Sequence, residues 1–243
     1  MDPAIWGPSV WNIMIDVASR IDRSNQLNNE TEWAVIFYQC LCCLIPCIHC
    51  QNSYVTFLIE LPVVEYIEKR QTLLWVWKIK EKVNDKLNKP ESYRLLFELL
   101  ERRVNCLSNQ TSDSQVFDIL FLFCINIQTH DKERWKCFRD FIISLSVISP
   151  FMGINKLIIK NSPPKTEQQN EFITYLYTIR KLYHDINSFL LPPLVPLKQL
   201  ITRYLNCRTD TKEITRINYM IIDSSTWETK LLPIVSNNKD KKN

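Results

Sequence analysis

Residues 32–50 read EWAVIFYQCLCCLIPCIHC, an apolar run that ends in a closely spaced pair of cysteines. Residues 32–45 are apolar around most of the circumference of a helix, which predicts a buried helix. Pro46 ends that helix, and Cys47 and Cys50 follow at the break. Two cysteines at this spacing can close a disulfide across one helical turn, and a helix N-terminus stabilises a thiolate. The pair is therefore predicted to be redox-active.

The composition predicts an all-α fold. The chain has only two glycines among 243 residues, although tight turns and hairpins depend on glycine. Its apolar fraction of 46% is enough to build a hydrophobic core. Apolar spacing predicts helices over 6–20, 51–70 with an interruption at Pro62, 71–88 and 91–105.

The charge and hydropathy patterns indicate which partners and which cellular compartment this chain is suited to. A net charge of +4, from 30 basic and 26 acidic residues, is too balanced to indicate nucleic acid or an anionic membrane. No apolar run reaches the length of a membrane span, and the N-terminus lacks the pattern of a secretory signal. We therefore expect a soluble cytoplasmic protein. In a reducing cytosol, nine cysteines point to metal binding or redox chemistry rather than to structural disulfides.

A zinc site is the main alternative for the cysteine-rich stretch, because several thiols and His49 lie close together in sequence. A structural zinc site usually needs a second, separate ligand pair, and outside residues 40–50 the chain has no Cys-x-x-Cys motif. A thioredoxin domain fits poorly, because no alternating strands and helices precede the motif. Cys40, Cys42 and Cys43 are interpreted as small buried apolar residues, although a relay from Cys43 to the redox pair stays open.

Four short matches between the two halves of the chain suggest an internal duplication. They occur in the same order, with offsets that drift only from about 106 to 101. The alternative is chance similarity between unrelated amphipathic helices. The matching segments are 11–15 with 117–121, 37–46 with 141–150, 80–90 with 183–193, and 99–106 with 200–207.

On this basis the chain is divided into a redox module (1–106), a degenerate second module (107–207) and a C-terminal tail (208–243). The first two ranges include the repeat segments, which extend roughly over 6–106 and 113–207. The second module has Phe151-Met152-Gly153-Ile154 in place of the Cys-x-x-Cys motif, so it is predicted to lack thiol chemistry there. Cys106 and Cys207 occupy equivalent repeat positions and either bridge the modules or are simply buried. Residues 217–221 in the tail could form a short strand.

Residues 6–90 contain an ordered set of spaced positions: Trp11, Ala18, Pro46, Cys47, Cys50, Trp75, Val83, Asn84, Leu87, Lys89 and Pro90. This set resembles the Erv/ALR family of FAD-linked sulfhydryl oxidases, and the spacings from Trp11 to Cys47 and from Cys50 to Trp75 agree with that family to within about a residue. The opening WGPSVW is similar to versions encoded by large DNA viruses.

The resemblance implies a four-helix bundle with a short fifth helix, FAD held between the helices, and a homodimer or an intramolecular pseudo-dimer. Cys47 would face incoming protein thiols, Cys50 would lie against the flavin, and molecular oxygen would be the final acceptor. Residues implied in cofactor binding are Trp11, Trp75, Lys80, Val83, Asn84, Lys86 and Leu87.

The chain departs from the family pattern where FAD contacts are expected. Ile15, Lys80 and Glu81 stand where the family has histidine, histidine and asparagine. Lys80 could still meet a phosphate as a point charge, whereas Ile15 cannot form a hydrogen bond. Two hypotheses follow: an FAD-linked thiol oxidase acting in the infected-cell cytoplasm or virion, or a structural or interaction protein of the same fold that no longer binds FAD.

Overall fold

The computed structural model describes residues 3–24, 27–89, 98, 113–128, 130–148, 150–166 and 168–186. The chain divides into two compact units, Met1–Cys207 and Arg208–Asn243. The second unit lies outside the described residues, and so does the strand expected at 217–221. Of the helix expected at 91–105, only residue 98 is described, and it is helical.

All regular structure in the described ranges is helical, which confirms the all-α prediction. We call the helices before residue 90 the N-terminal group and those after residue 112 the C-terminal group. The N-terminal group consists of α1 (Pro3–Arg23), α2 (Leu27–Leu44), α3 (Ile48–Glu60), α4 (Val63–Glu68) and α5 (Thr72–Lys86). The C-terminal group consists of α7 (Asp113–Asn126), α8 (Lys132–Ile148), α9 (Met152–Lys160) and α10 (Gln169–Ile186).

Prolines mark several helix ends. Pro3 occupies the first position of α1, where its missing N–H costs nothing, so the helix begins earlier than predicted and Pro8 falls in its second turn. α2 ends at Leu44, two residues before Pro46, because the residue preceding a proline disfavours helical backbone. The predicted interruption at Pro62 is confirmed, since Pro62 separates α3 from α4.

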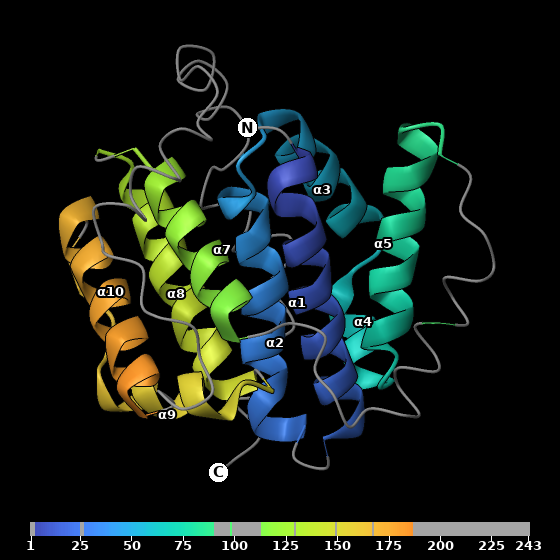
Figure 1. Ribbon diagram of the computed structural model, residues 1–243. Coiled ribbons are helices and arrows are strands. Elements are labelled where there is room, and N and C mark those ends of the chain that lie inside the picture. The colour runs from blue at the N-terminus through green and yellow to red at the C-terminus, as the bar shows by residue number, and fades with distance from the viewer. Residues whose placement is uncertain are drawn as a thin grey trace, which may run out of the picture. The chain divides into compact units, whose positions relative to one another are not determined.

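The two groups lie side by side and are joined chiefly by α2 and α8, which make the largest helix–helix contact in the described ranges (Figure 1). α1 packs against both α5 and α7. Within the N-terminal group α2 also contacts α3 and α4, and within the C-terminal group α8 contacts α9 while α7 and α9 contact α10. Cys47 and Cys50 lie where α2 ends and α3 begins, within the N-terminal group.

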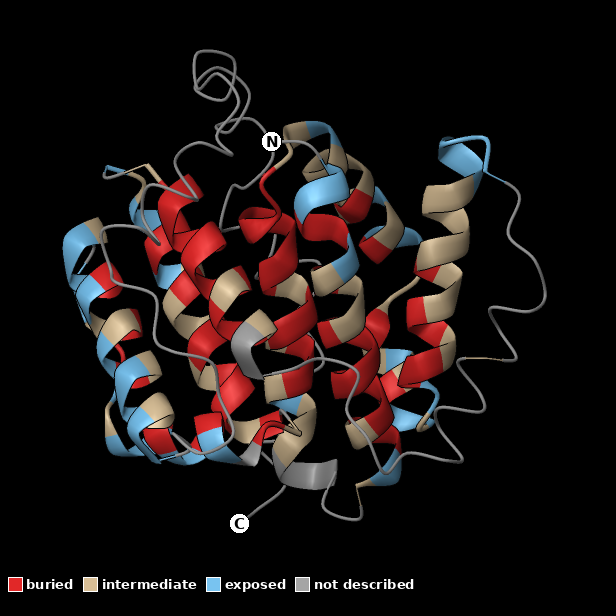
Figure 2. Ribbon diagram, viewed as in Figure 1, coloured by how far each residue is buried: buried red, intermediate tan, exposed pale blue. Residues whose placement is uncertain are grey.

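The core runs through the central helices. Figure 2 shows buried residues along α1, α2, α7 and α8, and exposed residues on the outer side of α10. Phe37 of α2 stacks on Phe141 of α8 with ring centroids 5.0 Å apart, and Phe123 of α7 meets Phe141 edge-on at 5.7 Å. All three rings are at most 1% exposed. The predicted burial of 32–45 is confirmed, since most of its side chains are buried.

Candidate functional site

Cys47 and Cys50 are joined by a disulfide at the N-terminus of α3, with their Cα atoms 5.2 Å apart. Cys47 is the N-cap residue, and the backbone N–H of Cys50 donates to its Sγ over 3.3 Å. Both cysteines are half-buried, and His49 between them is exposed. The disulfide is thus at the edge of the core and partly open to solvent. Sulfurs bonded to each other are not available as thiolate ligands, so this arrangement does not favour the zinc alternative.

Gln51 holds the turn that carries the motif. Its side-chain Nε2 donates to the carbonyl of Ile45 at 2.7 Å and to that of Cys43 at 3.2 Å. These carbonyls lie in the last turn of α2 and just beyond it, where the carbonyl oxygens have no partner within the helix. Its backbone N–H also donates to the carbonyl of Cys47 at 2.9 Å. One residue of α3 therefore fixes the distance between the end of α2 and the disulfide.

Two buried tyrosines tie the helix of the motif to the rest of the N-terminal group. The hydroxyl of Tyr54 on α3 donates to the carbonyl of Tyr38 on α2 at 3.0 Å, and the hydroxyl of Tyr38 donates to that of Met14 on α1 at 3.0 Å. Burial raises the pKa of both phenols well above the ordinary value. The sequence analysis missed these residues, although tyrosines at apolar helical positions are a usable signal for buried hydrogen bonds.

Trp75 lies in the core rather than on an open surface. Its side chain has no exposed area, and its indole Nε1 donates to the carbonyl of Leu61 at 2.8 Å. The rings of Tyr38 and Tyr54 meet it edge-on at 4.8 and 6.5 Å. In this arrangement the ring of Trp75 offers no surface to a cofactor.

The other residues implied in FAD binding lie on α1 and at the end of α5. Trp11, Lys80, Val83 and Asn84 are half-buried, and Leu87, just beyond α5, is 55% exposed.

Side chains on α3 and α5 are bonded to one another. The Nζ of Lys86 donates to the Oγ of Ser53, and the Nζ of Lys82 lies 2.6 Å from a carboxylate oxygen of Glu60. Ile15 is 4% exposed and belongs to the core. With Trp75 enclosed and Lys86 engaged by α3, the described contacts do not fit the flavin site that the resemblance implies.

A second group of thiols lies where α2 meets α8. Cys40, Cys42 and Cys43 are buried, and Cys137 of α8 is half-buried against them. The guanidinium Nε of Arg134, itself 6% exposed, donates to the carbonyl of Cys43 at 2.9 Å. The prediction that Cys40, Cys42 and Cys43 are buried is therefore confirmed. The sequence did not predict that Cys137 lies against them.

The remaining cysteines are isolated or not described. Cys124 is buried in α7, and burial raises its pKa. Cys106 and Cys207 lie outside the described residues. Within the described ranges, no group of three or more histidine, cysteine or acidic side chains is placed to hold a metal ion.

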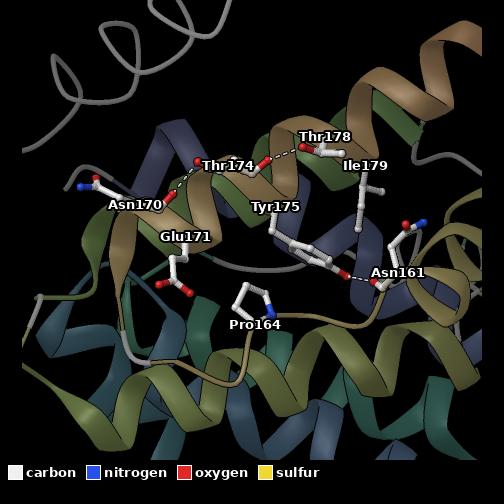
Figure 3. Close-up of a pocket in the computed structure, with 8 residues that line it drawn as sticks. All are labelled: Asn161, Pro164, Asn170, Glu171, Thr174, Tyr175, Thr178 and Ile179. Atoms are coloured by element: carbon white, nitrogen blue, oxygen red, sulfur yellow. Dashed lines mark hydrogen bonds between the residues drawn. The ribbon is translucent and has the colours of Figure 1, made fainter.

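An open hollow of about 460 Å³ lies beside α10 (Figure 3). Tyr175 points into it and donates to the carbonyl of Asn161 at 2.8 Å, with Pro164 opposite. The oxygens of Thr174 and Thr178 are bonded to helix carbonyls one turn earlier, so they are turned away from a ligand. None of its lining residues belongs to the predicted redox site.

No described helix is long and apolar enough to cross a membrane. No family model matches this chain, and no curated protein or solved structure matches it either.

Proposed function

We propose that this chain is an Erv/ALR-type thiol oxidoreductase that introduces disulfides into proteins through Cys47 and Cys50. The observation that carries the proposal is the disulfide at the start of α3, half-buried and held by the N-cap geometry of Cys47. A disulfide in this position can be reached by a substrate thiolate, unlike one enclosed in a core.

The proposed reaction consists of two thiol–disulfide exchange steps. A substrate thiolate attacks the sulfur of Cys47, forms a mixed disulfide and releases Cys50 as a thiolate. A second substrate thiolate then attacks the substrate sulfur and expels Cys47. The N–H of Cys50 and the N-terminus of α3 stabilise the thiolate of Cys47 that leaves. Two substrate thiols are oxidised to a disulfide, and the Cys47–Cys50 disulfide is reduced to two thiols.

The resemblance implies that FAD would accept the electrons of the reduced pair and pass them to oxygen. The burial of Trp75 and Ile15 and the contacts of Lys86 do not fit that site, so the proposal includes no flavin step. The same contacts favour a second candidate, in which the chain is a structural or interaction protein, for example of a virion, and Cys47–Cys50 is a fixed disulfide.

The order and packing of the helices support an intramolecular pseudo-dimer. In both groups the second helix, α2 or α8, lies at the contact between the groups, and the first helices α1 and α7 also meet. A further parallel is a hydrogen bond to the residue that follows the third helix. Trp75 donates to Leu61 after α3, and Tyr175 donates to Asn161 after α9. These parallels are what an ancient duplication would leave, with α9 lacking the redox pair.

A single-turnover assay separates the two candidates. The oxidised full-length chain is mixed with a reduced dithiol protein, and the disulfide formed in the substrate is counted. We expect one substrate disulfide per chain for the wild type and none for Cys47→Ser or Cys50→Ser. Cys124→Ala is the matched control, because its thiol is buried in another helix. If the wild type transfers no disulfide while remaining folded, the oxidoreductase proposal is wrong.

The visible absorption spectrum of the purified protein tests the cofactor separately. We expect no flavin band, even after incubation with FAD and removal of the excess. A stable flavin band would show that the contacts around Trp75 and Lys86 rearrange, and it would support the FAD-linked oxidase. The exchange assay does not depend on this result, because it measures a single turnover.

A further inference from the structure

Four cysteines form a second thiol site between α2 and α8, which we call the thiol cluster: Cys40, Cys42, Cys43 and Cys137. Cys40 and Cys43 are three residues apart, so they share one face of α2. Cys137 approaches that face from α8, and its Sγ lies 3.5 Å from the carbonyl oxygen of Cys40. Its thiol also interacts with the thiols of both Cys40 and Cys43.

Geometry limits which cysteines can be joined. The shortest thiol contact is 3.4 Å, between Cys42 and Cys43. These residues are adjacent, so their Cα atoms are about 3.8 Å apart, whereas disulfides usually need Cα atoms about 4.4–6.8 Å apart. Cys137 has no such restriction, because it comes from another helix. Cys40 and Cys43 have the same spacing as Cys47 and Cys50, so the possible bonds within the thiol cluster are one inside α2 and those that join Cys137 to α2.

Cys137 and Cys43 differ in solvent exposure and in pKa. Cys137 is the only half-buried member, so a small molecule can reach it first. Cys43 is buried and carries the acidic thiol. A hydrogen bond from Cys137, a second from Cys42 and the charge of Arg134 hold the pKa of Cys43 well below the ordinary value. The corresponding interactions raise the pKa of Cys42 and Cys137, which donate these hydrogen bonds.

We propose that Cys137 and Cys43 form a second, reversible redox site that is oxidised by low-molecular-weight disulfides and cross-links α2 to α8. This site goes beyond the proposed function, because it uses neither Cys47 nor Cys50. It requires only the contact between the two helices and a small disulfide as the oxidant.

The reaction proceeds in two exchanges. The thiol of Cys137 passes its proton to the thiolate of Cys43 and attacks a small disulfide. This leaves a mixed disulfide on Cys137 and releases one small thiolate, which takes the proton back from Cys43. The thiolate of Cys43 then attacks the sulfur of Cys137 and releases the second small thiolate. Two cysteine sulfurs are oxidised, one small disulfide is reduced, the proton of Cys137 ends on one small thiol, and solvent protonates the other.

The bond would connect the two helix groups at their largest contact. Oxidation would therefore fix the N-terminal group, which carries the Cys47–Cys50 disulfide, to the C-terminal group.

Treatment with oxidised glutathione, followed by alkylation and mass spectrometry without reduction, tests the proposal. In the wild-type chain we expect a peptide cross-linked between Cys43 and Cys137, the loss of two titratable thiols, and no retained glutathione. In Cys43→Ala, which places no hydroxyl in the interior, we expect glutathione trapped on Cys137. Cys42→Ala is the matched control and should still form the cross-link.

Four outcomes would overturn the proposal: a wild-type chain that keeps glutathione on Cys137, one in which Cys137 does not react, a bond between Cys40 and Cys137, or a bond between Cys40 and Cys43. The double variant Cys47→Ser/Cys50→Ser should still form the cross-link. That result makes the test independent of the exchange assay, so either proposal can fail without the other.

Discussion

At the scale of single residues, one carboxylate replaces a local helix cap. Gln71, the N-cap residue of α5, makes no side-chain capping bond. Asp22 of α1 takes its place: its two carboxylate oxygens accept the backbone N–H groups of Thr72 at 2.8 Å and Leu73 at 3.0 Å. The helix dipole favours a negative charge at this end. Asp22 therefore joins α1 to α5 and fixes where α5 begins.

We predict that Asp22→Ala lowers the free energy of unfolding by about 2 kcal/mol, because two buried N–H groups lose their acceptor. Urea denaturation followed by circular dichroism measures the change. Glu68→Gln, at an exposed position on α4, is the control and should change the stability little. An Asp22→Ala protein as stable as the wild type would mean that water or another group caps α5.

At the scale of elements, the contact of α2 with α8 depends on aromatic packing. Phe141 lies between Phe37 of α2 and Phe123 of α7, and all three rings are buried. Arg134 and Cys137 lie earlier in the same helix, so the position of α8 also sets the geometry of the thiol cluster.

We predict that Phe141→Ala destabilises the protein by about 3–5 kcal/mol through lost burial and the cavity it leaves. Phe141→Leu, which keeps much of the volume, should cost less. The same chemical denaturation measures both. Cross-linking of Cys43 to Cys137 should be slower in Phe141→Ala, because the two helices are less firmly held. Equal stability of the alanine and leucine variants would show that the core refills the cavity.

At the scale of the whole molecule, two buried tyrosine hydroxyls predict that the folded protein loses stability at alkaline pH. Burial raises the pKa of Tyr38 and Tyr54 in the folded state. The unfolded chain releases these protons above about pH 10, whereas the folded chain retains them. The stabilising effect is thus fully present below pH 10 and is lost as the pH rises above it.

We predict that the free energy of unfolding falls above about pH 10, by up to about 1.4 kcal/mol per pH unit for each buried tyrosine. Denaturation midpoints between pH 8 and 11.5 measure the slope. Tyr54→Phe should reduce it, while Tyr177→Phe, at a half-buried position on α10, serves as the control. A slope unchanged in Tyr54→Phe would show that its hydroxyl reaches water in the folded protein.

The sequence was a good guide where local chemistry determines local structure. The scarcity of glycine and the apolar spacing predicted the helices, and Pro46 and Pro62 predicted breaks that the structure contains. The spacing of Cys47 and Cys50 predicted a pair that can be bridged, and the pair is bridged. These features depend on neighbouring residues along the chain, so they can be inferred without knowing the fold.

Only the tertiary structure decided which distant groups meet. Asp22 caps a helix that begins 50 residues later, and Cys137 faces thiols nearly 100 residues earlier, although no local pattern links them. Trp75 has the spacing of a cofactor residue, yet packing against Tyr38 encloses it. Helix periodicity determines which face of a helix is apolar, but not which other helix covers it. By itself the sequence determined the helices and the pairing of Cys47 with Cys50, and the packing of α2 against α8 brought Cys137 to the thiols of α2.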